Sequence, residues 1–144
     1  MSTAVAFFLA PADRDAASAH RGGPHGRFAA VLGRHFCAED AVDDWDAYFV
    51  GPSSDQLFWQ RTDWIVPMTH DGSGMFAFPP RLTRALAGAS VEELEDLANR
   101  WSERLRCEDG EDMTDDNLLA IVQAVAELAT KAGAAGGNLY CWFF

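Results

Sequence analysis

The feature that most constrains this fold is NLYCWFF at residues 138–144, a run of large apolar and aromatic side chains in a strongly acidic chain. Left exposed, such a run would promote aggregation. Its length and composition favour a strand buried on both faces, and AGAAGGN before it supplies a turn. A similar run, TAVAFFLA at residues 3–10, is closed by Pro11. We expect these two strands to pair within one small sheet.

The first part of the chain between these strands is expected to hold a loop and two helices. The polar, glycine-rich stretch DRDAASAHRGGPHGR predicts the loop. RFAAVLGRHF predicts a short helix, with an apolar face made by Phe28, Val31, Leu32, His35 and Phe36. EDAVDDWDAYFVG predicts a second helix, capped by Asp40 and stopped by Gly51-Pro52. Its core side consists of Val42, Trp45 and Phe49.

The C-terminal half predicts three more helices. Pro80 opens the first, RLTRALAG, because a missing N–H costs little at that position, and Gly88 ends it. Ser90 and Glu93 form an S-x-x-E capping box for the second helix. Its apolar face consists of Val91, Leu94, Leu97, Ala98, Trp101 and Leu105. The third begins at Thr114 or Asp115 and ends at Gly133, with core positions Leu118, Ile121, Val122, Val125 and Leu128.

The middle segment, SSDQLFWQRTDWIVPMTHDGSGMFAFPP, predicts two short extended segments joined by the turn HDGSG. If they form a hairpin, Pro67 confines its first arm to a sheet edge, because proline cannot donate to a ladder. The whole order predicts a single α+β domain over residues 1–144. Its small sheet includes the N- and C-terminal strands and packs against about five helices.

The stretch from Met75 to Phe144 resembles the YfbM-like family of small bacterial proteins of unknown function. The resemblance lies in the order FPPRLTRALAG, SVEEL, the long helix AIVQAVAELATKAG and the closing strand LYCWFF, and it covers about half of the chain. The first half departs from the family pattern, mainly in the glycine-rich loop. The resemblance implies an α+β fold and a stand-alone cytosolic protein. It carries over no functional residues.

The net charge of -11 narrows the classes of partner. Nucleic acids and anionic membranes are disfavoured, because their binding sites depend on cationic side chains. A basic protein or a cationic ligand would be attracted, although the charge also serves solubility. Acidic groups between Glu39 and Asp46 and between Glu108 and Asp116 would steer such a partner. Asp43, Asp44 and Asp46 are expected to face water.

The cysteine usage and the terminal segments indicate a compartment. Three widely spaced cysteines, with no CxxC motif, are expected to be free thiols in a reducing cytosol. The N-terminal apolar run lacks a basic region and is too short for a signal peptide, and no stretch approaches the ~20 apolar residues that a membrane helix needs. One lysine against ten arginines in an alanine-rich chain suggests a high-GC bacterial genome.

Two segments are candidate binding sites. The first 36 residues carry four arginines against two aspartates, so HRGGPHGR is a local basic island. Its glycine amides with Arg21, His25 and Arg27 could hold an anion, or the loop could simply be solvated. The aromatic residues Phe58, Trp59 and Trp64 lie near His70 and Asp71, a mixture that suits a ligand pocket and equally suits a core.

The chain carries no recognisable catalytic, cofactor or metal motif. His20, His25, His35 and Cys37 do not have the spacing of a zinc site, and the loop around Gly110 fails the EF-hand pattern. THDGSGM is not a nucleophile elbow, Cys141 lies in a predicted buried strand, and neither Walker A nor GxGxxG occurs. We therefore expect no cofactor and no metal, and no catalytic residue is assigned.

Two functional hypotheses follow. The first is a non-enzymatic cytosolic protein-binding module, with an immunity-type role against a basic toxic protein as one version. The alternative is a small hydrolase or ligand-binding enzyme with a pocket around Trp64, His70 and Asp71. A pocket that joins His70 to a carboxylate would favour the enzyme, and a flat acidic face with exposed aromatics would favour the binding module.

Overall fold

A computed structural model describes residues 4–19, 28–33, 37–50, 63–67, 69, 72–109 and 115–144 of the chain. The described strands are β1 (Val5–Ala10), β2 (Ala30–Gly33), β3 (Asp63–Val66), β4 (Gly74–Ala77) and β5 (Asn138–Phe143). The described helices are α1 (Asp13–Ala17), α2 (Ala38–Val50), α4 (Pro80–Gly88), α5 (Val91–Asp109) and α6 (Asp115–Ala135). The α+β class and the approximate number of helices are as predicted, but the segment DRDAASAHRGGPHGR, predicted to be a loop, begins with the short helix α1.

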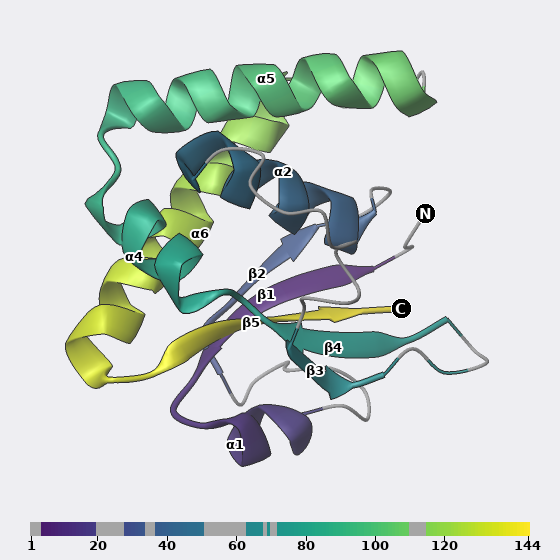
Figure 1. The fold of residues 1–144 in the computed structure, drawn as a ribbon, viewed down its shortest axis with the longest axis vertical. Coiled ribbons are helices and arrows are strands. Elements are labelled where there is room, and N and C mark those ends of the chain that lie inside the picture. The colour runs from purple at the N-terminus through teal and green to yellow at the C-terminus, as the bar shows by residue number, and fades with distance from the viewer. Residues whose placement is uncertain are drawn as a thin grey trace.

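The sheet is antiparallel, in the order β2-β1-β5-β4-β3, and β5 is its central strand (Figure 1). β1 and β5 pair along their whole length, with Phe7 opposite Cys141. Two hydrogen bonds between the backbones of Ala4 and Phe144, at 3.2 and 2.9 Å, extend this ladder beyond the strands. The predicted pairing of the two terminal strands is confirmed.

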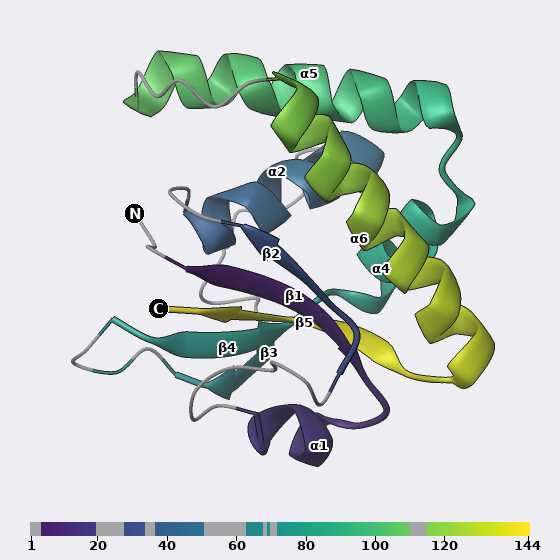
Figure 2. The same cartoon turned by 180° about the vertical axis from the view of Figure 1, so that it is seen from behind.

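Both faces of the sheet are covered, which explains why its inner strands have apolar residues at nearly every position. Phe7, Phe76, Cys141 and Phe143 belong to the core beneath α2, α4, α5 and α6. Their neighbours in sequence point to the other face, where Phe8, Met75, Tyr140 and Trp142 pack with α1. Figures 1 and 2 show α1 on the opposite side of the sheet from the larger helices.

The prediction of a helix over residues 28–36 was wrong in the part that the structure describes. Ala30–Gly33 form the edge strand β2, paired with β1 so that Val31 lies opposite Phe7 and Leu32 opposite Ala6. Val31 packs on the helix-covered core, whereas Leu32 is exposed. A short apolar run satisfies helix and strand periodicities equally, and here the pairing with β1 decides the outcome.

Helix α2 lies where predicted, but its cap differs. The first helical hydrogen bond runs from the Ala41 N–H to the Cys37 carbonyl, so Cys37 is the N-cap and Asp40 lies in the first turn. The helix ends at Val50, before Gly51. Val42 and Trp45 are buried as predicted. Trp45 lies at the centre of an aromatic cluster, 5.2 Å from the ring centroids of both Phe7 and Trp101.

Helices α4 and α5 follow the predicted signals closely. Pro80 is the first residue of α4. The capping box is formed, because the Ser90 N–H donates to Glu93 Oε1 at 3.0 Å and the Glu93 N–H donates to Ser90 Oγ at 3.2 Å. The predicted core face of α5 is buried except for Val91, which is exposed. Val91 begins the helix, ahead of the stretch that packs on α6.

Helix α6 extends two residues beyond the predicted stop at Gly133 and ends at Ala135. The stop is Gly136, whose φ of 73° is the left-handed conformation that favours glycine, and the Gly137 N–H donates to the Ala132 carbonyl at 3.0 Å. A Cβ on Gly137 would lie 2.7 Å from the Ala10 carbonyl oxygen. The second glycine therefore allows β5 to enter close to β1.

Residues Asn117–Ala135 of α6 are long and apolar enough to span a membrane by length and composition. The expectation that no stretch reaches this level was therefore wrong. A core helix passes the same test, and the predicted core positions of α6 are all buried: Leu118, Ile121, Val122, Val125 and Leu128.

The predicted hairpin is formed by β3 and β4. Gly72 has a φ of 83°, and the turn closes with hydrogen bonds from the Gly72 N–H to the Thr69 carbonyl and from the Thr69 N–H to the Ser73 carbonyl, at 3.0 and 2.9 Å. β3 is an edge strand followed by Pro67, as expected for its sequence.

Candidate functional site

The predicted aromatic pocket is only partly within the described residues. Trp64 lies on β3 and is half-buried, with its ring 5.6 Å from Phe76 and 6.2 Å from Phe143 between centroids. These contacts place Trp64 against the helix-covered core. Phe58, Trp59, His70 and Asp71 lie outside the described residues, so their meeting in one pocket stays a prediction.

The predicted anion-binding loop, with Arg21, His25 and Arg27, also lies outside the described residues. The same holds for His20 and His35 of the rejected zinc set. Across the part of the chain that the structure describes, no group of three histidine, cysteine, aspartate or glutamate side chains could hold a metal ion.

Cys37 and Cys141 are free thiols, as predicted, whereas the side chain of Cys107 is not described. Cys37 Sγ donates to Glu39 Oε2 at 3.0 Å and accepts from the Asp40 N–H. Burial, followed by the hydrogen bond to Glu39, raises the pKa of Cys37 to about 12. Complete burial likewise raises the pKa of Cys141 well above its usual range. Both thiols are therefore protonated at neutral pH and are poor nucleophiles.

We expect the protein to lose stability in alkaline solution. The Cys37 thiol titrates near pH 9 when exposed and near pH 12 when folded, so between these values the folded state retains a proton that the unfolded chain loses. The contribution of Cys37 is therefore fully present below pH 9 and declines as pH rises, by at most about 1.4 kcal/mol per pH unit. Urea unfolding between neutral pH and about pH 10.5 measures this slope.

The matched control is Cys37→Ser, which keeps a capping side chain but does not titrate in this range. The variant should show a shallower loss of stability than the wild type. Some slope will remain, because the pKa values of Cys141 and Tyr48 are raised as well and act in the same direction. Identical slopes for the two proteins would contradict the assigned role of Cys37.

The aspartates of α2 differ from the sequence expectation. Asp46, predicted to face water, has a side chain only 4% exposed and accepts two hydrogen bonds from Arg81, at 3.1 Å from Nε and 2.6 Å from Nη2. Asp44, 12% exposed, forms an ion pair with Arg104. The expectation was wrong for both because α2 is packed between α4 and α5, whose arginines lie far away in sequence. Asp40 is exposed and Asp43 half-exposed.

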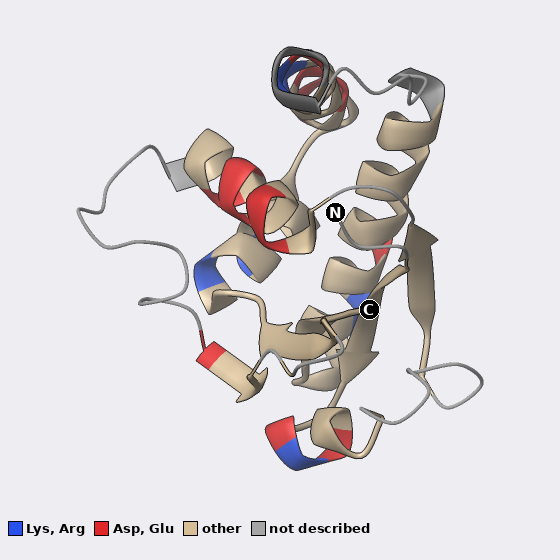
Figure 3. Cartoon of the chain, turned by 90° about the vertical axis from the view of Figure 1, so that its right-hand side faces the viewer, with Lys and Arg blue, Asp and Glu red and all other residues tan. Residues whose placement is uncertain are grey.

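The outward face of α5 carries more acid than base. Over residues 91–105, five exposed carboxylates stand against two arginines, which are Arg100 and Arg104. Arg100 pairs with Asp96 at 3.3 Å, and Arg104 pairs with Asp44. Figure 3 shows the acidic segments on both α2 and α5. Because Arg100 and Arg104 are both paired, the exposed carboxylates make the electrostatic potential of this face negative. We call the exposed carboxylates Asp40, Glu92, Glu95, Asp96 and Glu103 the acidic surface.

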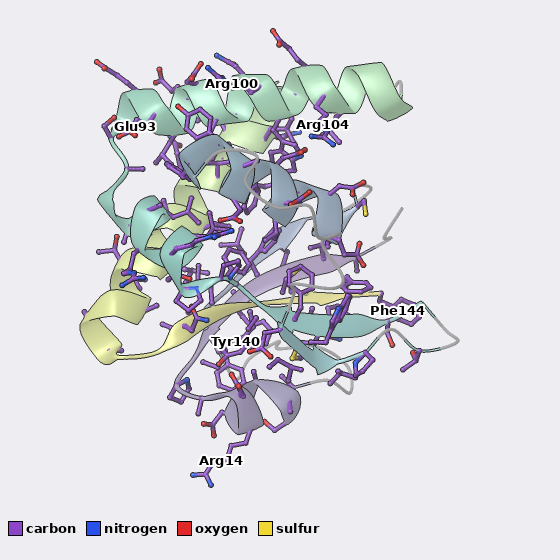
Figure 4. The ribbon with its side chains drawn as sticks, viewed as in Figure 1. Arg14, Glu93, Arg100, Arg104, Tyr140 and Phe144 are labelled. Atoms are coloured by element: carbon purple, nitrogen blue, oxygen red, sulfur yellow. The ribbon has the colours of Figure 1, made fainter. Side chains whose placement is uncertain are left out.

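An ordered cluster of Tyr48, Asp96 and Arg100 joins the two helices within this surface. Tyr48 Oη donates to Asp96 Oδ2 at 3.0 Å, and the guanidinium carbon of Arg100 lies 5.2 Å from the centre of the Tyr48 ring. Partial burial and the hydrogen bond to Asp96 raise the pKa of Tyr48. Figure 4 shows Glu93, Arg100 and Arg104 following one another along α5.

The sequence shows only part of this cluster. Asp96 and Arg100 are four residues apart in a helix, a spacing that allows an ion pair. Nothing in the sequence brings Tyr48 to them, because it lies 48 residues before Asp96. The antiparallel packing of α2 on α5 brings Tyr48 to Asp96, and the same packing pairs Asp44 with Arg104.

A second polar contact missed by the sequence lies on the opposite face of the sheet. Tyr140 Oη donates to Asp13 Oδ1 at 2.7 Å and ties α1 to β5 (Figure 4). Burial, followed by the hydrogen bond to Asp13, raises the pKa of Tyr140 above its usual range. The hydroxyl therefore stays protonated at neutral pH and serves as a hydrogen-bond donor.

Comparisons with family models, with curated proteins and with solved structures find no significant match to this chain. The resemblance of residues 75–144 to the YfbM-like family therefore stays a prediction.

Proposed function

We propose that this protein is a non-enzymatic binding module that recognises a basic protein through its acidic surface. The observation that carries the proposal is the charge of α2 and of residues 91–105 of α5, where Arg100 and Arg104 are already paired and several carboxylates are exposed. An immunity-type role, in which the partner is a basic toxic protein, is one form of this function.

The charge arrangement supports association with a cation more than with nucleic acid or an anionic membrane. Glu92, Glu95 and Glu103 are exposed on one helix, within a chain of net charge -11. Such a field raises the rate at which a basic partner arrives, and it repels polyanions. The free thiols of Cys37 and Cys141 support a reducing compartment, and we propose the cytosol.

The proposed test is partner capture from a lysate of the source organism, followed by association kinetics with the purified partner. We expect the association rate of Glu92→Gln/Glu95→Gln/Glu103→Gln to fall about tenfold at low salt, with a smaller change in the dissociation rate. Raising the salt should remove most of the difference, because exposed charges are screened beyond about 8 Å at physiological ionic strength.

The control is Glu127→Gln on α6, which removes an exposed carboxylate outside the acidic surface. Its effect per charge removed should be smaller than that of the triple variant. An association rate that ignores both salt and the three substitutions would leave solubility as the role of the charge and would count against the proposal.

A further inference from the structure

The two edges of the sheet differ in how well they are protected against pairing with another chain. β3 forms one edge, where a register shift lies between Trp64 and Val66 and Pro67 follows the strand. Asp63 adds an exposed charge to the same strand. All these features blunt an edge strand. β2 forms the other edge with the sequence AVLG, which has neither a charge nor a proline (Figure 2).

The register of β2 on β1 determines which backbone groups of β2 face outward. The Leu9 N–H donates to the Ala29 carbonyl at 3.2 Å, so these residues form a hydrogen-bonded pair. Such pairs alternate with non-hydrogen-bonded pairs in an antiparallel ladder, and the N–H and C=O groups of Ala30 and Leu32 therefore point away from β1. Both residues are exposed, and Leu32 is 58% exposed. Among the described strands, none pairs with this side of β2.

We propose that β2 pairs with β2 of a second copy of this chain, in antiparallel orientation, so that the dimer has one continuous sheet. Val31 lies opposite Val31 of the second copy, and Ala30 lies opposite Leu32. In this register every outward N–H of the two residues meets an outward C=O of the other copy. Leu32 lies opposite Ala6 of β1, on the face that carries α1. On that face the large leucine side chain of one copy meets the small alanine of the other.

The arrangement of the two edges favours a second copy as the occupant. Two identical antiparallel strands are related by a twofold axis, so a single contact closes the assembly. Pairing covers the β2 edge of both copies. The edges that remain are the two β3 strands, each with Asp63 and followed by Pro67. The dimer therefore removes the unprotected edge and creates no new one.

The charge beside β2 permits this contact in a chain of net charge -11. Helix α6 contacts β2, and over residues 117–135 its only charged side chains are Glu127 and Lys131, which are both exposed and opposite in sign. Ala120 and Gln123 are exposed and neutral. The acidic surface lies on α2 and α5. Two molecules can therefore approach through β2 and α6 without bringing an excess of like charge together.

The first test is sedimentation equilibrium of the full chain from about 5 to 500 μM, where we expect the mass to rise from one chain to two. A short ladder buries less than a stable interface of about 1,000 Å² or more, so the dissociation constant should be about 10–100 μM. Amide hydrogen exchange locates the contact. The amides of Ala30 and Leu32 should become protected at high concentration, whereas Val31, bonded to β1, should be protected throughout.

Two substitutions in β2 test the pairing directly. Ala30→Pro removes an outward N–H but no hydrogen bond to β1, so the chain should keep its fold and stay monomeric at all these concentrations. Leu32→Lys places a charge on the edge and should weaken dimerisation at least about tenfold. The matched control is Val91→Lys, which replaces another exposed apolar side chain and changes the net charge equally. It should change the dissociation constant less than about twofold.

A chain that stays monomeric up to about 500 μM would overturn the inference. So would a dimer that Ala30→Pro and Leu32→Lys leave intact, or one in which the amides of Ala30 and Leu32 exchange as fast as in the monomer, since either result places the contact elsewhere. The exchange measurement uses the wild-type chain and does not depend on the folding of a variant. Concentration-dependent protection of these two amides, lost with dimerisation in Leu32→Lys, supports pairing through β2.

Discussion

A chain that ends at Asn138 should not reach the folded state. The missing residues include nearly all of β5, which pairs with β1 on one side and β4 on the other. Five buried side chains are lost: Leu139, Tyr140, Cys141, Trp142 and Phe143. At about 1.5–3 kcal/mol each, their burial contributes about 8–15 kcal/mol, as much as the net stability of a typical domain, about 5–15 kcal/mol. Proton NMR should show collapsed dispersion and loss of upfield methyl signals.

Phe144→Ala is the control for this truncation. Phe144 is half-exposed, and its backbone bonds to Ala4 survive the substitution. The variant should therefore keep the native spectrum. A truncated chain that stays soluble with native dispersion would show that the two halves of the sheet close without β5.

The elements predicted correctly are those whose sequence is compatible with only one kind of secondary structure and burial. β1 and β5 are apolar at nearly every position and are bounded by proline or glycine, so only burial on both faces keeps them from water. α5 and α6 carry a helical apolar period over many turns. In these segments local pattern and tertiary packing favour the same structure.

The errors in the fold occur where the local signal was short or degenerate. Residues 30–33 are too few to distinguish helix from strand, and the exposed edge of β1 recruits them as β2. Asp40 has the composition of an N-cap, but the chain enters the helix three residues earlier, where the Cys37 sulfur accepts from the Asp40 N–H. Whether residues 30–33 form a strand, and where α2 begins, depends on contacts with strands that lie far away in sequence.

The sequence indicated an acidic surface, but it did not predict the carboxylates of α5 as part of it. The other segment expected to steer a partner, Glu108 to Asp116, has side chains outside the described residues. The excess of carboxylates is visible in the composition, and the acidic part of α2 was recognised. The sequence could not show which aspartates of α2 face solvent and which form ion pairs, because Arg81, the partner of Asp46, lies 35 residues after it. Tyr48 and Asp96 also meet only through the packing of α2 on α5.

The pairing of Asp46 with Arg81 is therefore a structural contact that joins α2 to α4. Asp46 is almost fully buried, whereas Arg81 has 45% of its side chain exposed. This asymmetry determines which substitution costs more. Removing Asp46 leaves an arginine that water can still solvate. Removing Arg81 takes two charge-assisted hydrogen bonds from a carboxylate that water barely reaches.

We expect Arg81→Ala to lower the free energy of unfolding by about 3–5 kcal/mol and Asp46→Ala by about 1.5–3 kcal/mol. The double variant should cost less than the sum of the two, since each single substitution already removes the contact. Urea unfolding of the three proteins measures these differences. Arg84→Ala, an exposed arginine on the same helix, should change stability by no more than about 0.5 kcal/mol. If Arg81→Ala were as mild as Arg84→Ala, or if the costs of the single variants simply added, the ion pair would not hold α2 to α4.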